Sequence, residues 1–321
     1  MKGKKKKIIN LVVFTSILAL STYKGFKLVD AKNKAYELVN THTIESTYHG
    51  ENIVAHRGFS SIAPDNSYES VSLALDCECV DLIEIDVRMT QDGKLVLHHD
   101  STLSIEDLPV RIEDLNLEEI DVEKLNRKYP NFSFENYLYD DTLFQLDRYF
   151  GKGFDDNDLI TFSNFTRWYS FDKPMIIDVK CNEVNERFED ELYRLLKDHK
   201  DNVYIQCYSY DFLKSMQEKY PDFKYLFLVR LNSDISLMNN DSFAGYTVRS
   251  GLLSKIKIDP EKMYFLYTVN SSKKFFGLLN NPNYRDNMYI ITDNPDYLCA
   301  LGESKKLARG KRGNSKNGSK L

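Results

Sequence analysis

The chain has 321 residues, of which 42% are hydrophobic and 28% charged, enough for one large α/β domain or two smaller ones. The formal net charge of −5 is uneven, because residues 1–7 hold five lysines and residues 303–321 hold seven Lys or Arg against one Glu. This leaves about −16 on residues 8–302. Such an acidic body argues against nucleic acid as a partner.

The first expected element is an apolar helix. The lysine run is followed by "IINLVVFTSILAL" at 8–20. A basic start before a short apolar run is typical of a secretory signal or signal anchor, so residues 1–23 are predicted to hold the protein at the cell membrane. The lysines should stay in the cytoplasm and the rest should lie outside it. Cleavage near "ALS" at 19–21 would instead release the protein, and residues 24–50 are expected to form a linker.

Eight short apolar, β-rich runs then recur. They are 52–58, 81–87, 94–100, 174–180, 203–209, 224–230, 263–270 and 288–294. Most are almost continuously apolar, as strands buried on both faces are. Helical patterns at 66–77, 185–199 and 210–220 alternate with them, which indicates parallel strands with helical crossovers. The pattern predicts a (β/α)8 TIM barrel over 51–302, with an open doubly wound sheet as the alternative.

Residues 100–173 interrupt this rhythm. The stretch is acidic and aromatic, and we interpret it as an insertion between the third and fourth strands, with a crossover helix at 142–150. Long insertions in barrel enzymes often shape substrate access. The Gly-, Ser-, Asn- and Lys-rich tail at 303–321 is expected to be disordered.

The chain has an odd number of cysteines and no CxxC motif. They are Cys77, Cys79, Cys181, Cys207 and Cys299. Cys77 and Cys79, separated by one residue, are expected to form neither a zinc ligand pair nor a disulfide with each other. We interpret the cysteines mainly as small apolar residues. The alternative is that two of them form one disulfide bond, if the domain is exported.

Carboxylates occur in the predicted strands near their C-terminal ends, where barrel active sites lie. Glu84 and Asp86 are two residues apart, so both point to the same side of a strand. Asp178 lies in the fourth run. Carboxylates buried together repel each other unless a cation lies between them. The three residues therefore predict an all-oxygen site for Mg²⁺ or Ca²⁺.

Positive charges and histidines accompany these carboxylates. Arg57 and Lys180 suit an anionic phosphate. His56 and the histidine pair in "LHHD" at 97–100 could supply an acid and a base near neutral pH. A metal, cations and two histidines together indicate phosphodiester hydrolysis.

The segments "IVAHRGFSSIAPDNSYES" and "DLIEIDVRMTQDGKLVLHHDSTL" resemble the glycerophosphodiester phosphodiesterase family. The order and spacing of the HRG turn, the E-x-D strand, the Thr-x-Asp-Gly turn and the His-Asp pair agree over residues 53–103. Weaker matches in "IIDVK", "IQCYS", "YTVN" and "IITDNPD" extend to about residue 300. The resemblance implies a (β/α)8 barrel that uses a divalent metal to hydrolyse glycerophosphodiesters to an alcohol and glycerol 3-phosphate.

The resemblance also implies a role for each matching residue. His56 and His99 would be the acid–base pair, Arg57 and Lys180 would bind the phosphate, Tyr267 would contact the glycerol, and Glu84, Asp86 and Asp178 would hold the metal. Two residues depart from the family pattern, since Asp178 replaces Glu and Tyr267 replaces Trp. Strand alternation should turn His98 away from His99, which predicts a structural role for His98.

The substrate remains open at this stage. It could be a deacylated phospholipid, a lysophospholipid cleaved in a phospholipase D-like reaction, or a glycerol-phosphate polymer of the cell envelope. A non-catalytic barrel that binds such groups is an alternative of a different class. A phosphatidylinositol-type phospholipase C also uses two histidines in a barrel but lacks the spacing seen here.

Overall fold

The computed structural model describes residues 52–61, 63–105, 108–120, 159–238 and 242–302. The expected signal segment at 1–23, the linker at 24–50, the helix at 142–150 and the tail at 303–321 lie outside these residues. Within the described ranges, no helix is both long and apolar enough to cross a membrane.

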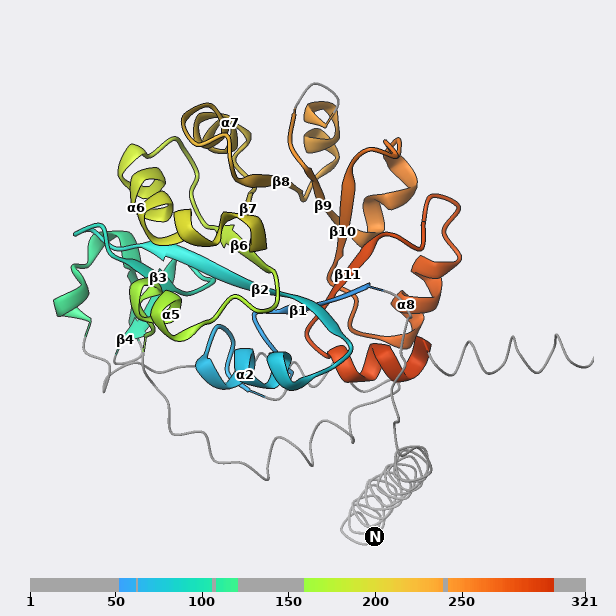
Figure 1. The fold of residues 1–321 in the computed structure, drawn as a ribbon, viewed down its shortest axis with the longest axis horizontal. Helices are drawn as coiled ribbons and strands as arrows, with labels where there is room; N and C mark the ends of the chain where they lie inside the picture. Colours follow the sequence, from blue (N-terminus) through green and yellow to red (C-terminus); the bar gives the residue numbers. More distant parts are fainter. Residues whose placement is uncertain (1–51, 62, 106–107, 121–158, 239–241, 303–321) are drawn as a thin grey trace, which may run out of the picture. The chain divides into compact units, whose positions relative to one another are not determined.

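Eight parallel strands form a closed barrel (Figure 1). They are β1 (Asn52–His56), β2 (Val80–Met89), β6 (Met175–Val179), β7 (Val203–Cys207), β8 (Lys224–Val229), β9 (Gly245–Arg249), β10 (Met263–Tyr267) and β11 (Tyr289–Thr292). Each strand pairs with the next, and β1 pairs with both β2 and β11. This closure confirms the predicted barrel and excludes the open sheet.

Helices surround the strands (Figure 1). The α-helices are α2 (Tyr68–Asp76), α5 (Phe162–Trp168), α6 (Glu186–Leu196), α7 (Tyr210–Lys219) and α8 (Ser272–Leu279), and residues 295–302 are also helical. The 3₁₀ segments η4 (Lys197–Asn202), η5 (Asn232–Leu237) and η6 (Ser250–Lys255) follow α6, β8 and β9. Side-chain oxygens of Ser67, Asn185, Ser209 and Ser271 accept hydrogen bonds from the first turns of α2, α6, α7 and α8. The three helices expected from the sequence are present as α2, α6 and α7.

Two strand assignments from the sequence are wrong. The run at 94–100 contributes only β3 (Leu95–Leu97), which pairs antiparallel with β2 as a hairpin. The insertion therefore lies between the second and third barrel strands, and not between the third and fourth. The strand missing from the prediction is β9, whose apolar pattern is interrupted by Thr247. This residue is buried and donates a hydrogen bond to Gln206 of β7.

The described part of the insertion has its own small core. It contains the antiparallel pair β4 (Thr102–Ile105) and β5 (Leu108–Arg111), followed by the 3₁₀ turns η1 (Ile112–Asp114) and η2 (Leu117–Glu119). The buried cluster consists of Val96, Leu103, Ile112, Ile120 and Leu159. The insertion is thus packed beside the end of β3, next to the two histidines.

Strand alternation separates the barrel interior into an apolar layer and a polar layer. The apolar layer contains Val54, Leu82, Ile176, Leu226, Phe265 and Ile291. Two residues further along the same strands stand His56, Glu84, Asp178, Leu228, Tyr267 and Asp293. Since successive side chains point to opposite faces, these residues also face inward, at the C-terminal mouth of the barrel.

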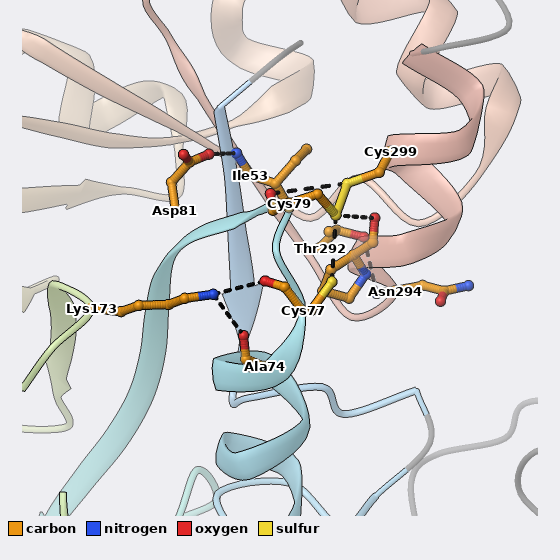
Figure 2. The surroundings of a disulfide bond; sticks show 10 residues. Ile53, Ala74, Cys77, Cys79, Asp81, Lys173, Thr292, Asn294 and Cys299 are labelled. Carbon is orange, nitrogen blue, oxygen red and sulfur yellow. Dashed lines mark hydrogen bonds between the residues drawn. A yellow bond between two sulfur atoms is a disulfide. The ribbon is translucent and has the colours of Figure 1, made fainter. Parts of the chain in front are cut away.

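A disulfide joins Cys79, just before β2, to Cys299 in the helix at 295–302 (Figure 2). The two residues are 220 positions apart in the sequence. Cys77 is free, with its Sγ 3.4 Å from that of Cys79. As expected, Cys77 and Cys79 do not pair with each other. The bridge links the segments that flank the closing strand, β1.

Candidate active site

The turn after β1 is shaped by close contact with α2. Gly58 has φ +77°, and a Cβ at this position would lie 2.5 Å from the backbone carbon of Ser70. Arg57 also has a left-handed backbone, with φ 57°, which is uncommon outside glycine. Its N–H donates to Glu84 over 2.9 Å, and its carbonyl accepts from the Ser70 hydroxyl over 2.9 Å. The turn therefore fixes His56 and Arg57 beside the first carboxylate.

The three predicted metal ligands come together in the barrel mouth. One carboxylate oxygen from each of Glu84, Asp86 and Asp178 lies within 4.8 Å of the others, and all three side chains are buried. Register explains the grouping, because Asp86 pairs with Asp178 across β2 and β6, while Glu84 pairs with His56 across β2 and β1.

Asp86 is the carboxylate whose charge the protein compensates best. Lys180 Nζ lies 2.8 Å from its Oδ1 and Arg57 Nε lies 3.1 Å from its Oδ2. Asn66 donates to Oδ2 over 2.9 Å and accepts from the Asp86 N–H over 2.8 Å. Burial alone would raise the pKa of Asp86, but Lys180 and Arg57 hold it well below its usual range.

The charges of Glu84 and Asp178 are compensated less completely than that of Asp86. Burial and repulsion from Asp86 raise the pKa of Glu84 to about 8. Asp178 binds Lys180 through Oδ2, 2.5 Å from Nζ, but its buried Oδ1 accepts no hydrogen bond. Both residues line the cavity, whereas Asp86 does not. A hard divalent cation fits this donor set, because it would satisfy the orphaned oxygen and relieve the repulsion that raises the pKa of Glu84.

The pKa values of the two candidate catalytic histidines are shifted in opposite directions. Burial and Arg57 lower the pKa of His56, but Asp293 and Glu84 outweigh them and leave it raised. The Nδ1 of His56 lies 2.5 Å from Asp293 Oδ1. Burial lowers the pKa of His99, and so do Arg57 and Lys180, while Asp86 and the pairing with Asp100 only partly oppose this. The structure therefore favours a protonated His56 and a neutral His99.

His99 and its neighbour His98 are separated as expected. His99 Nδ1 lies 2.7 Å from Asp100 Oδ1, and Arg88 donates to the His99 carbonyl over 2.8 and 2.9 Å. His99 lines the cavity and His98 does not. The Nε2 of His98 instead lies 3.3 Å from the carbonyl of Thr102 in the insertion.

A cavity of about 330 Å³ lies at the barrel mouth. It is lined by His56, Arg57, Glu84, Arg88, His99, Asp100, Ser101, Asp178, Lys180, Gln206, Tyr208, Leu228, Arg230, Thr247, Tyr267, Thr268 and Ile291. Seven of the eight site residues expected from the sequence belong to this lining, and the eighth, Asp86, is held by two of them. The hydroxyl of Tyr267 lies 3.5 Å from the carbonyl of Val229, so its ring stands between β8 and β10.

Five residues at or beside the cavity were not predicted from the sequence as part of the site. They are Asp65, Asn66, Arg88, Arg230 and Asp293. Asp65 binds Arg57 over 2.6 Å, within the "PDNS" segment. Asp293 lies two residues after Ile291, so alternation would have shown that it faces inward, but only barrel closure brings it to His56. Asn270 donates to its other oxygen.

The geometry defines a class of protein: a TIM barrel whose mouth combines two histidines with a carboxylate cluster that could hold a metal ion. The chain belongs to the glycerophosphoryl diester phosphodiesterase family, whose sequence model matches residues 56–296. It is thus a phosphoric diester hydrolase, as the resemblance implied.

Individual relatives agree with this assignment. YhdW of Bacillus subtilis, provisionally named a glycerophosphodiester phosphodiesterase, is 23% identical over 79% of this chain and 99% of its own length. The glycerophosphodiester phosphodiesterase of Haemophilus influenzae is 35% identical over 27% of this chain and 22% of its own.

Solved structures share the fold at low identity. The glycerophosphodiester phosphodiesterase of Thermotoga maritima aligns with a TM-score of 0.55 and 19% identity, covering 79% of this chain and 99% of the other. A phosphodiesterase of Oleispira antarctica, in complex with its product sn-glycerol-3-phosphate, aligns with a TM-score of 0.57 and 18% identity, covering 78% and 97%.

Proposed function

We propose that this enzyme hydrolyses glycerophosphodiesters to glycerol 3-phosphate and an alcohol, with a divalent cation bound by Glu84, Asp86 and Asp178, outside the cytoplasmic membrane. The observation that carries the proposal is the placement of His56 and His99 in one cavity with Glu84 and Asp178 of the carboxylate cluster. The opposite directions of the two histidine pKa shifts agree with it. An acid and a base poised at neutral pH are what the cleavage of a phosphodiester requires.

The roles of the two histidines follow from their protonation. His99, neutral and held at Nδ1 by Asp100, accepts a proton from the attacking water while the water oxygen bonds to phosphorus. His56, protonated and held at Nδ1 by Asp293, donates its proton to the leaving alcohol oxygen as the bond from phosphorus to that oxygen breaks. Arg57 and Lys180 line the same cavity and balance negative charge on the phosphoryl oxygens.

The bound cation would supply further charge stabilisation at the phosphoryl oxygens. Glu84 and Asp178 expose oxygens toward the cavity, while Asp86 shares its charge with Lys180 and Arg57. The shorter Asp178, where the family has Glu, keeps its place in the cluster because its strand stands directly beside β2. Oxygen ligands suit both Ca²⁺ and Mg²⁺.

Two features support a location outside the cytoplasm. The lysine-rich start and apolar run of residues 1–23 have the character of a signal or signal anchor. The disulfide between Cys79 and Cys299 suits an oxidising compartment, because cytosolic thiols are kept reduced. A reporter enzyme that is active only after export, fused after residue 50, should be active and should lose activity when residues 1–23 are deleted.

Turnover by the purified full-length chain tests the chemistry. Glycerophosphoglycerol and glycerophosphoethanolamine are incubated with Ca²⁺ or Mg²⁺, with and without EDTA, and glycerol 3-phosphate is measured. We expect release that stops with EDTA, returns with added metal and falls by ~10²–10⁴-fold in His56→Ala. Binding of these compounds without any turnover would favour a non-catalytic barrel.

A further inference from the structure

A second group of positive charges lies on the side of the mouth formed by β7 to β10. Tyr208, Arg230, Arg249 and Tyr267, which we name the arginine rim, stand at or just beyond the C-terminal ends of these four strands. Tyr208 follows Gln206 by two positions, Arg230 follows Leu228 and Arg249 follows Thr247. The three preceding residues all line the cavity, and Tyr208, Arg230 and Tyr267 line it as well. Arg249 is exposed at the end of β9, outside this lining.

Arg230 differs from the other cations of the cavity. Arg57 binds Asp65 and Asp86, Arg88 binds Glu113, and Lys180 binds Asp86 and Asp178. Each of these cations is thus in contact with at least one carboxylate of the protein. Among the described residues, Arg230 forms no ion pair with a carboxylate. The nearby Asp234 uses one oxygen to accept from the backbone N–H groups of Arg230 and Leu231, both over 2.8 Å.

The guanidinium of Arg230 is nevertheless held in place. It lies over the ring of Tyr208, 3.9 Å from the centroid, and the hydroxyl of Tyr208 donates to Asn182. Burial raises the pKa of Tyr208, whereas Arg88 and Arg230 both act to lower it. The charge of Arg230 is therefore positioned but not neutralised.

The other half of the rim adds to this positive field. Arg249 stands directly beside Tyr267 in the register of β9 and β10, and it also forms no ion pair among the described residues. Burial raises the pKa of Tyr267 to about 12, and Arg230 and Arg249 oppose the rise. Both arginines thus act on the same hydroxyl group, that of Tyr267, which lines the cavity.

The rim disfavours cationic substrates. A quaternary ammonium group binds best to an open aromatic face, but Arg230 already covers the face of Tyr208. An unneutralised guanidinium beside it would repel the ammonium of a choline or ethanolamine head group. The same guanidinium is well suited to a phosphate or carboxylate.

We infer that the arginine rim is a second anion-binding subsite, and that the preferred substrates carry an anionic group in addition to the scissile phosphodiester. This inference rests on the proposed hydrolysis of glycerophosphodiesters and specifies their class. The second group could be the next phosphate of a glycerol-phosphate chain or a phosphate on a small head group, since both present the same chemistry to Arg230.

A matched pair of substrates tests the subsite in the full-length, metal-loaded enzyme. Glycerophosphoglycerol is compared with the same compound carrying a terminal phosphate, and kcat/KM is measured for each. We expect kcat/KM to be about tenfold higher for the phosphorylated compound, mainly through a lower KM. One charge-assisted hydrogen bond stabilises a bound ligand by enough to give a ratio of this size. Arg230→Gln should remove most of this preference. The control Arg285→Gln should retain it, because the exposed side chain of Arg285 donates to the backbone carbonyls of Pro282 and Tyr284 and does not line the cavity.

Further substrates show which kind of molecule supplies the second anionic group, and which results would contradict the inference. Cleavage of a glycerol-phosphate oligomer at a rate similar to that of the phosphorylated compound would support the subsite and point to polymer chains. Cleavage of the small compound alone would support it and point to head groups. Equal kcat/KM for the matched pair, unchanged in Arg230→Gln, would overturn the inference while hydrolysis stands. No turnover of any compound would overturn the proposed function, and the inference with it.

Discussion

At the scale of single residues, the two proposed catalytic histidines show how neighbouring charges shift the pKa of a side chain and so favour one chemical role. Each imidazole has a carboxylate at Nδ1, yet the pKa of His56 is raised and that of His99 is lowered. Asp293 is half-buried, held by Asn270 and in direct contact with His56, so its charge acts strongly on that imidazole. Asp100 is exposed, so solvent screens its charge on His99.

This difference predicts the pH dependence of the reaction. Activity should rise with pH as His99 deprotonates, below its ordinary value of 6.5, and fall as His56 deprotonates, above that value. Asp293→Asn removes a charge that raises the pKa of His56, so the alkaline limb should move to lower pH and the maximal kcat/KM should drop by about 10²-fold. The profile of kcat/KM against pH checks this. The exposed Asp222→Asn should leave the profile unchanged, and an unmoved alkaline limb in Asp293→Asn would refute the assignment.

The adjacent histidines make a second comparison. His99→Ala should lose ~10²–10⁴-fold in kcat, because it removes the proposed general base. His98→Ala should keep activity within about tenfold, because His98 contacts Thr102 and does not line the cavity. Steady-state kinetics on one glycerophosphodiester measures both. Equal losses would mean that the side chains are assigned to the wrong faces.

At the scale of elements, the turn between β1 and α2 carries the strictest backbone requirement in the site. Gly58→Ala would place a methyl group 2.5 Å from Ser70 in a left-handed conformation. We expect a loss of about 1–3 kcal/mol in the free energy of unfolding, together with reduced activity, because the same turn positions His56 and Arg57. Urea denaturation measures the stability. Gly251→Ala, with no atom within 4 Å of the added carbon, should change it by less than about 0.5 kcal/mol.

At the scale of the whole domain, closure of the barrel depends on β1, which joins the first and last parts of the chain. The disulfide from Cys79 to Cys299 ties together the segments beside this strand (Figure 2). Because it closes a very long loop, it should restrict the unfolded chain and contribute about 2–5 kcal/mol.

Reduction of the disulfide should therefore lower thermal stability. For a domain of this size we expect Tm to fall by roughly 5–15 °C in dithiothreitol. The double variant Cys79→Ala/Cys299→Ala should have a similarly low Tm that dithiothreitol does not change. Thermal unfolding followed by circular dichroism measures both. A wild-type Tm that stays constant after thiol titration has shown full reduction would contradict this contribution.

Much of the site could be predicted because its residues lie in short, ordered motifs. The positions of Glu84 and Asp86 on one face follow from strand periodicity alone. The third barrel strand could not be identified from periodicity. The apolar run at 94–100 would look the same in a hairpin, where it lies, as in a barrel, where it was predicted. β9 was missed because Thr247 is buried through a hydrogen bond to another strand, which no local pattern reveals.

The sequence by itself determined the barrel class, the residue types at the mouth and the separation of His98 from His99, because these depend on spacing within one strand or turn. Tertiary structure alone decided the partner of Cys79, the contact of Asp293 with His56 and the position of the Arg230 guanidinium over Tyr208. Each of these depends on which strands become neighbours when the barrel closes. Closure brings together residues more than 200 positions apart, and their burial and mutual charge then set their chemistry.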